Sequence, residues 1–532
     1  MQWSTLIVFL LLFVLVTVLG FVAAHWRKAD LNQLHEWGLG GRRFGTWVTW
    51  FLLGGDVYTA YTFIAVPALV FGAGALGFFA VPYTIIAYPI VFAVLPRLWY
   101  VAHKHNYVTG ADFVRGRYDS PLLGLLVAIT GILATMPYIA LQLVGMEVVI
   151  SALGFPMSGW AADLPLLTAF VILAAFTYTS GLRAPALIAI IKDSLVYITV
   201  IATVVIIPMQ LGGFGKIFAA VPPAKVLLAA PVGQSLGMYS AFATLALGSA
   251  LALFIYPHVL TGVLSAKNAR TLTRNMAFLP AYTLVLGLLA LLGFMALAAG
   301  VDKVPQYAPF FKQYANSFAV PALLMHSFPG WFVGVGFAAI VIGALVPAAI
   351  MSIAASNLWT RSIYRAYINP RCTEAQEASQ AKLASLVVKF GALVFVLALP
   401  ATYAIQFQLL GGIWIIQILP ALVFGLYTRW FHRYALALGW LAGMTAGTAI
   451  AAHLKFAGSI YPLHVFGYAI PGYAALYSLI LNIAVAAALT VLLRLLGVAG
   501  GQDQTTPGDY RAAVPDRDSG AGDGQMAAPP TL

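Results

Sequence analysis

Charged residues are scarce in this chain of 532 residues. Only 8% of them are Asp, Glu, Lys or Arg, whereas about a quarter are charged in a typical water-soluble protein. Hydrophobic residues make up 62% of the chain, and the mean hydropathy is +0.92. This composition indicates an integral membrane protein, and so much apolar sequence excludes a receptor with a single transmembrane helix.

Cysteine is almost missing as well. Cys372 is the only one in the sequence, which excludes an internal disulfide framework and a cysteine metal cluster. A polytopic membrane enzyme would want a clustered acid/base or metal constellation, and the nine histidines and sixteen acidic residues show no motif of that kind. We therefore expect no enzymatic activity and no cofactor.

Long apolar stretches dominate the chain instead. A transmembrane helix takes about 20 apolar residues, and the sequence predicts thirteen such stretches within a transmembrane domain at 1–496. The fold class predicted is therefore an all-α integral membrane protein with about thirteen transmembrane helices. The stretches are 4–24, 45–71, 75–96, 122–154, 163–179, 187–211, 236–261, 276–299, 331–358, 385–406, 409–427, 434–453 and 472–495.

The basic residues fix the expected orientation. With the N-terminus outside, all but five of the 28 lysines and arginines fall on the cytoplasmic side, as the positive-inside rule demands. The net charge of +12 is thus a consequence of topology and gives no support to nucleic-acid binding. Lys192 lies near the cytoplasmic end of stretch 187–211, where snorkelling accounts for it. The five residues left outside are Lys216, Lys225, Lys303, Lys312 and Lys455.

The segments between and after the stretches have their own character. Thr109 and Asp112 fit an N-cap pair, so 109–118 is predicted to be a short surface helix. The outside loop 300–330 is expected to form either a short interfacial helix or a lid. The segment 497–532 has almost no large apolar residues, and we expect it to be a disordered cytoplasmic tail.

Two stretches carry helix-breaking sequences at mid-membrane depth. Stretch 45–71 contains Gly54-Gly55-Asp56; each glycine weakens a helix by about 1 kcal/mol relative to alanine, and an aspartate at the bilayer centre costs about 3 kcal/mol. Stretch 236–261 has candidates at Gly248-Ser249 and at Tyr256-Pro257-His258. Interrupted helices at matching positions of two halves indicate a transporter built from inverted repeats.

The two interrupted stretches lie five stretches apart, which predicts a five-plus-five core with broken helices 2 and 7. The repeats would span about 45–211 and 236–427. At such a break, exposed N–H groups can hold an anion, and freed carbonyls can coordinate a cation.

Six segments occur in an order and on a side of the membrane that match one family. Together they resemble the sodium/solute symporter family over about residues 25–500, and the segment 35–62 looks most like its bacterial monocarboxylate permease branch, which takes up lactate, pyruvate and related short acids. The six are Gly38-Leu39-Gly40-Gly41-Arg42-Arg43, Gly54-Gly55-Asp56, the segment 109–118, Ser180-Gly181-Leu182-Arg183-Ala184 with Asp193, Pro257-His258, and Ala349-Ile350-Met351-Ser352 followed by 361–365.

The resemblance implies a cation-coupled symporter of the bacterial inner membrane that imports a small monocarboxylate by alternating access. Its partners would be the small organic anion and the lipid bilayer, with no obligate protein partner. Two alternatives stay open, namely a sodium-coupled symporter for another small solute such as an amino acid, and a solute sensor on the same scaffold that does not transport.

The resemblance also implies a sodium site between helices 2 and 9. Carried over residue by residue, its ligands are the carbonyls of Gly54, Val57 and Ala349 and the hydroxyl of Ser352. The family's usual second hydroxyl falls at Ile353, which has none. A hard cation needs several oxygen ligands, so the coupling ion is left as Na+ or H+, with Asp56 or Glu147 as the proton carrier.

The substrate carboxylate is expected at the start of the second half of helix 2. No arginine lies at that depth, so backbone N–H groups would supply the donors. The predicted substrate residues are Val57, Tyr58, Thr59, Gln142, Gly248 and Ser249. Each candidate has a structural alternative: Asp56 could cap the broken helix, and Ser352 could bond back to its own helix.

Overall fold

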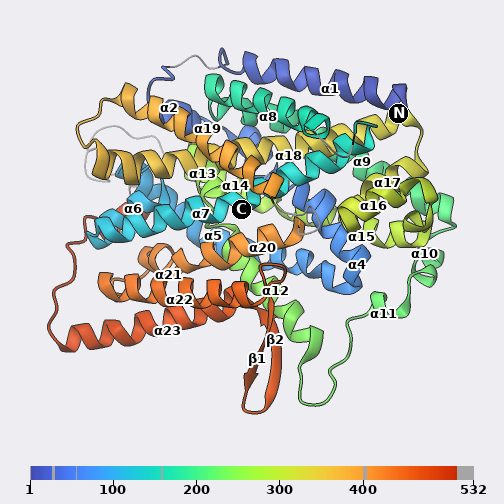
Figure 1. Cartoon of the computed structure of the whole chain (residues 1–532). Helices are drawn as coiled ribbons and strands as arrows, with labels where there is room; N and C mark the ends of the chain where they lie inside the picture. The colour runs from blue at the N-terminus through green and yellow to red at the C-terminus, as the bar shows by residue number, and fades with distance from the viewer. Residues whose placement is uncertain (1, 27–29, 56, 157–159, 399–403, 512–532) are drawn as a thin grey trace, which may run out of the picture.

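The computed structural model describes residues 2–26, 30–55, 57–156, 160–398 and 404–511 (Figure 1). Helices make up most of it, together with one antiparallel hairpin of two strands, β1 (Ile460–Val465) and β2 (Tyr468–Tyr473). The α-helices are α1 (Trp3–Val22), α2 (Leu34–Leu39), α3 (Thr46–Thr49), α4 (Val66–Ala73), α5 (Ala80–Lys104), α6 (Gly110–Tyr118), α7 (Pro121–Ala152), α8 (Trp160–Ser180), α9 (Arg183–Leu211), α10 (Phe214–Ala220), α11 (Pro223–Val226), α12 (Gly237–Leu253), α13 (Pro257–Ser265), α14 (Ala269–Phe278), α15 (Pro280–Ala299), α16 (Ala308–Tyr314), α17 (Ala319–Ser327), α18 (Gly330–Trp359), α19 (Glu374–Ala398), α20 (Ala404–Ile415), α21 (Leu419–Leu422), α22 (Arg433–His453) and α23 (Ala474–Leu495).

The helices confirm the membrane class predicted from composition. Within the described ranges, nine helical segments are long and apolar enough to cross a membrane, or ten if the bent pair α12 and α13 counts as one span. A shorter apolar helix covers 164–180 in α8. The number thirteen and the inverted repeat stay predictions.

The long helix α18 is buried by α7, α1, α9 and α19, which pack around it (Figure 1). Every residue from 336 to 358 is buried, as expected of a helix that is apolar on all sides. Because α18 carries Ala349 and Ser352 while α7 carries Gln142 and Glu147, the core holds the residues predicted to bind ions and substrate.

The break predicted in stretch 45–71 is confirmed. The helix begins with α3, continues as a π-helical turn η2 (Trp50–Gly54), is interrupted by a turn at 57–59, and resumes as a second π-helical turn η3 (Tyr61–Ala65) before α4. Turns of π-helix are rare and occur frequently at functional sites. Asp56 lies outside the described residues.

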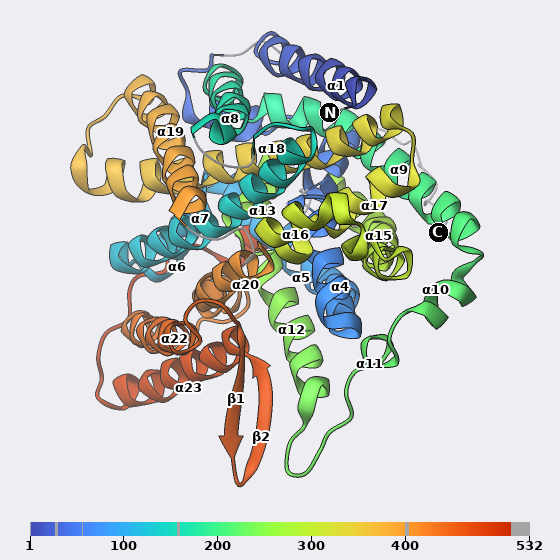
Figure 2. The same cartoon turned by 45° about the vertical axis from the view of Figure 1, so that its right-hand side comes forward.

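The second break lies at residues 254–256, between α12 and α13, where the chain bends by 45°. Pro257 opens α13 and has no N–H to continue the preceding helix. The alternative break at Gly248-Ser249 is wrong, because both residues lie inside the continuous α12. A Cβ on Gly248 would lie 2.6 Å from the Tyr473 ring, so this glycine serves the packing of α12 beside β2 (Figure 2).

The segment 300–330 forms short helices, as one of the two alternatives predicted. Its α16 and α17 lie over the C-terminal ends of α4 and α7. The Tyr314 hydroxyl is 2.5 Å from the Ser151 hydroxyl at the end of α7. Phe311 stacks on Phe71 of α4 with 5.9 Å between the ring centroids.

The chain beyond α23 differs from the expected disordered tail as far as residue 511. Asp503 forms ion pairs with Arg117 of α6 and with Arg429, each at 3.0 Å. The Arg117 side chain is only 5% exposed, so Asp503 supplies the countercharge for a nearly buried cation. Residues 512–532 lie outside the described part of the chain.

A second contact fixes the same segment to the end of α5. Asp509 pairs with Lys104 at 2.5 Å and with His105 at 2.8 Å. Burial opposes the ionisation of Asp509, but hydrogen bonds from Lys104, His105 and Thr506 outweigh it and lower the pKa of this carboxyl. Because the pKa of Asp509 is lower in the folded protein than in the unfolded chain, the ionised carboxylate stabilises the fold at neutral pH. This stabilisation is lost only when the pH falls through the lowered pKa of the folded state.

We predict that Asp503→Ala loosens the segment 498–511. Removing the carboxylate leaves Arg117 without its countercharge and should lower the free energy of unfolding by about 1 to 3 kcal/mol. Thermal unfolding in detergent and protease cleavage after residue 497 measure the effect. Asp302→Ala, at an exposed position, is the matched control. Equal stability and cleavage in both variants would contradict the role assigned to Asp503.

Candidate functional site

The second half of the broken helix begins with its N–H groups already hydrogen-bonded. The Thr59 N–H donates to the Thr62 hydroxyl at 3.0 Å, and the Tyr61 N–H donates to the Thr59 hydroxyl at 3.0 Å. The Ala60 N–H donates to the Gln142 side-chain oxygen at 3.0 Å. Side chains therefore occupy the positions where a substrate anion was expected to dock.

Gln142 reaches this turn from α7, as predicted. Val57 and Tyr58 are less well placed for an anion, because their N–H groups donate back to Gly54 and Gly55 of the first half-helix, at 2.9 and 3.1 Å. The structure therefore brings Gln142 to Ala60, and the N–H groups of Val57 and Tyr58 are directed back at the first half-helix.

Lys192 lies at the same turn, from α9. Its ammonium donates to the Gly55 carbonyl, donates to the Tyr58 carbonyl at 3.0 Å, and lies 3.0 Å from a carboxylate oxygen of Asp193. Both charged side chains are 0% exposed. The expectation that Lys192 snorkels to the membrane surface is wrong, because α9 begins at Arg183 and Lys192 lies about 13 Å along it at 1.5 Å per residue.

Tyrosines enclose this ion pair. The second carboxylate oxygen of Asp193 accepts a hydrogen bond from the Tyr282 hydroxyl at 2.9 Å. The Tyr282 ring lies 4.6 Å from the Tyr58 ring and 6.3 Å from the Tyr197 ring, between centroids. The pair is thus screened from lipid by aromatic side chains that also carry polar groups.

Two glycines allow this close packing. A Cβ on Gly54 would lie 2.2 Å from the Tyr282 ring, and one on Gly55 would lie 2.8 Å from the Lys192 nitrogen. Neither space accommodates a side chain. The glycine pair that the sequence offered as a helix breaker therefore also lets Lys192 and Tyr282 approach the backbone.

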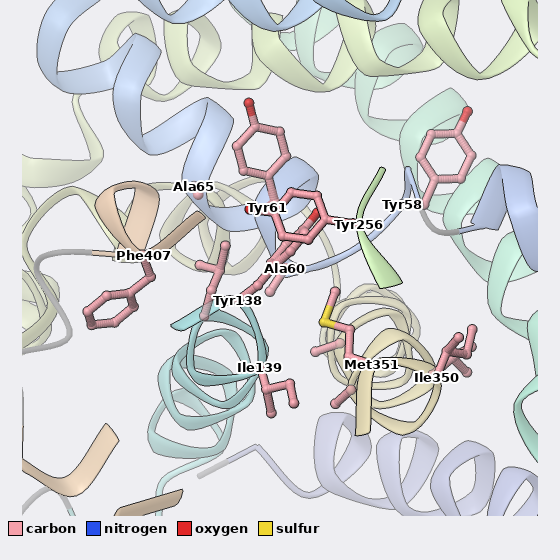
Figure 3. Close-up of a cluster of buried hydrophobic side chains, with 14 of the residues drawn as sticks. Tyr58, Ala60, Tyr61, Ala65, Tyr138, Ile139, Tyr256, Ile350, Met351 and Phe407 are labelled. Atoms are coloured by element: carbon pink, nitrogen blue, oxygen red, sulfur yellow. The ribbon is translucent and has the colours of Figure 1, made fainter. Parts of the chain in front are cut away.

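A buried aromatic cluster lies on the other side of the turn. Figure 3 shows Tyr61, Tyr138 and Tyr256 together, with Tyr58 apart from them. The Tyr138, Tyr256 and His258 rings lie 5.3 to 5.5 Å from one another.

Three buried polar atoms near this cluster find no hydrogen-bond partner among the described residues: Tyr61 Oη, His258 Nδ1 and Gln408 Oε1. Buried polar groups are normally hydrogen-bonded, so such atoms need an explanation. A cavity beside Pro257 and Gly131, which none of these three residues lines, has a volume of about 20 Å³. It is large enough for about one water molecule and too small for an organic acid.

The part of the predicted sodium site on α18 is also hydrogen-bonded within the protein. The Ser352 hydroxyl donates to the Ala349 carbonyl at 2.8 Å and accepts from the Ser385 hydroxyl at 3.3 Å. The Lys389 ammonium donates to Ser385 at 2.7 Å, and Lys389 is 0% exposed. Ile353 is buried and adds no oxygen.

The remaining candidates lie away from the turn or outside the described residues. Glu147 is half-buried on α7, more than one helical turn beyond Gln142. The Ser249 hydroxyl is buried without a partner in the described part of the chain, while Gly248 packs on Tyr473. Asp56, the other expected proton carrier, falls on the undescribed position between Gly55 and Val57.

Sequence reasoning missed the buried lysines. The signal was available for Lys192, because an ionisable residue inside a membrane helix is functional by default. Starting the stretch at 187 instead of Arg183 placed it too near the surface. Lys389 was counted with the cytoplasmic lysines for the same reason, although α19 begins at Glu374 and buries it.

The broken helices, the buried ion pair and the apolar bundle define a multi-pass membrane transporter. The model of the sodium:solute symporter family matches residues 37–447. The chain belongs to that family.

Relatives agree with this assignment. The chain is 53% identical to a monocarboxylate transport permease protein of Rhizobium johnstonii over 497 residues, which are 92% of this chain and 97% of the relative. It is 36% identical to the uncharacterized symporter YodF of Bacillus subtilis, over 86% of this chain and 90% of the relative. A sodium/proline symporter of Staphylococcus aureus is 22% identical over 84% of this chain and 85% of its own.

Solved structures share the fold. A Na+-coupled sialic acid symporter in a substrate-bound, outward-open state matches with a TM-score of 0.72 at 14% identity, over 94% of this chain and 99% of that protein. A nucleobase-cation-symport-1 family transporter in a closed conformation matches with a TM-score of 0.53 at 10% identity, over 91% and 100%. At these identities the likeness shows the fold alone.

We predict that Gly54→Ala destabilises the protein. The added methyl group meets the Tyr282 ring, and overpacking of this kind costs about 1 to 3 kcal/mol. Gly45→Ala, where a Cβ meets nothing within 4 Å, should change stability by less than about 0.5 kcal/mol. Thermal unfolding of the two purified variants measures the difference in stability. Equal melting temperatures would show that the Tyr282 ring can move aside without loss of stability.

Proposed function

We propose that the protein is a cation-coupled symporter that imports a small monocarboxylate such as lactate or pyruvate. The observation that carries this proposal is the 53% identity, across nearly the whole of both chains, to a protein named as a monocarboxylate transport permease. We place the carrier in a bacterial inner membrane with its N-terminus outside, on the strength of the basic-residue bias.

The substrate carboxylate docks at Thr59 and Ala60. Their N–H groups form the N-terminus of the second half-helix, whose dipole favours an anion. The carboxylate replaces the Gln142 oxygen on the Ala60 N–H, and the Gln142 amide turns so that its NH₂ group donates to the substrate.

The apolar part of the substrate faces the cluster of Tyr61, Tyr138 and Tyr256. A short acid carries one hydroxyl or keto oxygen beside its carboxylate, and the unpartnered Tyr61 hydroxyl and His258 nitrogen offer polar contacts for it. Ligand sites combine apolar walls with a few such polar groups.

Access alternates by movement at the two breaks. The turn at 57–59 and the 45° bend between α12 and α13 interrupt the two helices that flank the site. Residues at element ends can absorb the φ/ψ changes of a hinge, while α18 and α7 keep the centre fixed.

Uptake of radiolabelled pyruvate into proteoliposomes tests this function. We expect accumulation under an inward cation gradient and none in liposomes without the protein. Binding without accumulation would favour a solute sensor, and accumulation of amino acids in place of pyruvate would overturn the assigned substrate class.

We predict that Gln142→Ala raises the KM for pyruvate about tenfold or more, since a hydrogen bond to a charged group contributes about 1.5 to 3 kcal/mol. Thr59→Ala should raise the KM by less, because it keeps its N–H and loses only the hydroxyl that accepts the Tyr61 N–H. Thr445→Ala, at an exposed position on α22, is the control and should leave uptake unchanged. An unchanged KM and maximal rate in both site variants would place the substrate elsewhere.

A further inference from the structure

The residues expected to bind sodium do not fit a sodium ion. The Gly54 carbonyl accepts the Val57 N–H at 2.9 Å, and the Ala349 carbonyl accepts the Ser352 hydroxyl at 2.8 Å. Ile353 supplies no oxygen. Sodium is a hard cation that needs several oxygen ligands directed at one point, and here two of the candidate carbonyls already accept hydrogen bonds from the protein's own donors.

A protein cation occupies the neighbouring oxygens. The Lys192 ammonium contacts the carbonyls of Gly55 and Tyr58, each one residue beyond a carbonyl expected to bind sodium. Asp193 adds a carboxylate oxygen at 3.0 Å. Two carbonyls and a carboxylate are the oxygen types that surround a bound alkali or alkaline-earth cation.

The ammonium has no donor left for another ligand. It carries three N–H groups, and Gly55, Tyr58 and Asp193 provide three acceptors. Contact between Lys192 and the substrate carboxylate would break one of these bonds inside a buried site. The geometry therefore favours Lys192 as the cation that binds the carbonyls of the broken helix. It does not favour Lys192 as the group that binds the substrate carboxylate.

The opposite half of the expected sodium site has a lysine as well. Lys389 reaches Ser352 through the Ser385 hydroxyl. A sodium ion between the turn and α18 would therefore lie between two buried lysine side chains, whose nitrogens already bond the nearby oxygens.

We propose that Lys192 is a built-in cation that takes the place of sodium at the broken helix, so that transport does not require sodium. The inference about transport rests on the proposed function. The inference that Lys192 excludes sodium from the site rests on the geometry alone, and a sodium-binding assay can test it separately. Gly55 belongs to the same arrangement, because a Cβ there would displace the ammonium.

The wild-type protein gives the first test. Proteoliposomes with an imposed inward proton gradient should accumulate pyruvate in sodium-free choline buffer, and adding sodium at the same pH and membrane potential should change the rate by less than about twofold, since the site holds no sodium. Uptake that requires sodium would overturn the proposal.

The second test creates a vacancy for sodium. Lys192→Ala removes the ammonium and leaves the carbonyls and Asp193 facing each other, so sodium-free uptake should fall at least about tenfold. Added sodium should restore part of it, because the freed oxygens can then bind the ion. Lys216→Ala, an exposed lysine on α10, is the control and should behave as the wild type does. Undiminished sodium-free uptake by Lys192→Ala would refute the role.

A binding measurement separates this inference from the proposed function. Radiolabelled sodium and sodium-dependent thermal stabilisation are measured on purified protein, with no substrate present. We expect neither for the wild type and both for Lys192→Ala. Specific sodium binding to the wild type would overturn the inference even if pyruvate is transported. If no monocarboxylate is transported, the sodium-binding result still decides whether Lys192 replaces sodium.

If Lys192→Ala does not fold, Lys192→Met/Asp193→Asn removes both charges and leaves no lone buried carboxylate. This variant should express, lose most of its uptake, and regain none with sodium, because it lacks the anionic ligand. Uptake equal to that of the wild type would show that the ion pair only supports the fold.

Discussion

The structure depends on one constraint, which is that a broken helix inside a membrane must have its backbone groups satisfied from elsewhere. The turn at 57–59 frees carbonyls on one side and N–H groups on the other. Lys192 donates hydrogen bonds to the free carbonyls. The Gln142 side chain and the hydroxyls of Thr59 and Thr62 accept hydrogen bonds from the free N–H groups. Lys192 and Gln142 come from α9 and α7, so the break can exist only where those helices pass close by.

The sequence was sufficient to predict the class, the first break and the neighbourhood of Gln142. Those predictions depend on local features: composition, a glycine pair, and an amide inside an apolar helix. The capped helix beginning at Thr109 was predicted for the same reason, and the structure shows the reciprocal bonds of Thr109 and Asp112. Each of these signals is complete within a few residues of the chain.

The rest could not be predicted because it depends on which helices meet. The sequence suggested a helix break at Gly248. In the structure this glycine instead makes room for the ring of Tyr473, a residue far along the chain. Lys192 and Lys389 looked like surface lysines until the true helix starts placed them inside. A polar tail looked unable to fold, but its acidic residues find basic partners on other elements.

That last feature constrains how the protein can move. Asp503 connects Arg117 of α6 with Arg429 before α22, and Asp509 connects the segment to the end of α5. While these contacts hold, the neighbouring ends of α5, α6 and α22 behave as one rigid body. Any opening at that face must therefore occur by displacement of other helices relative to this body.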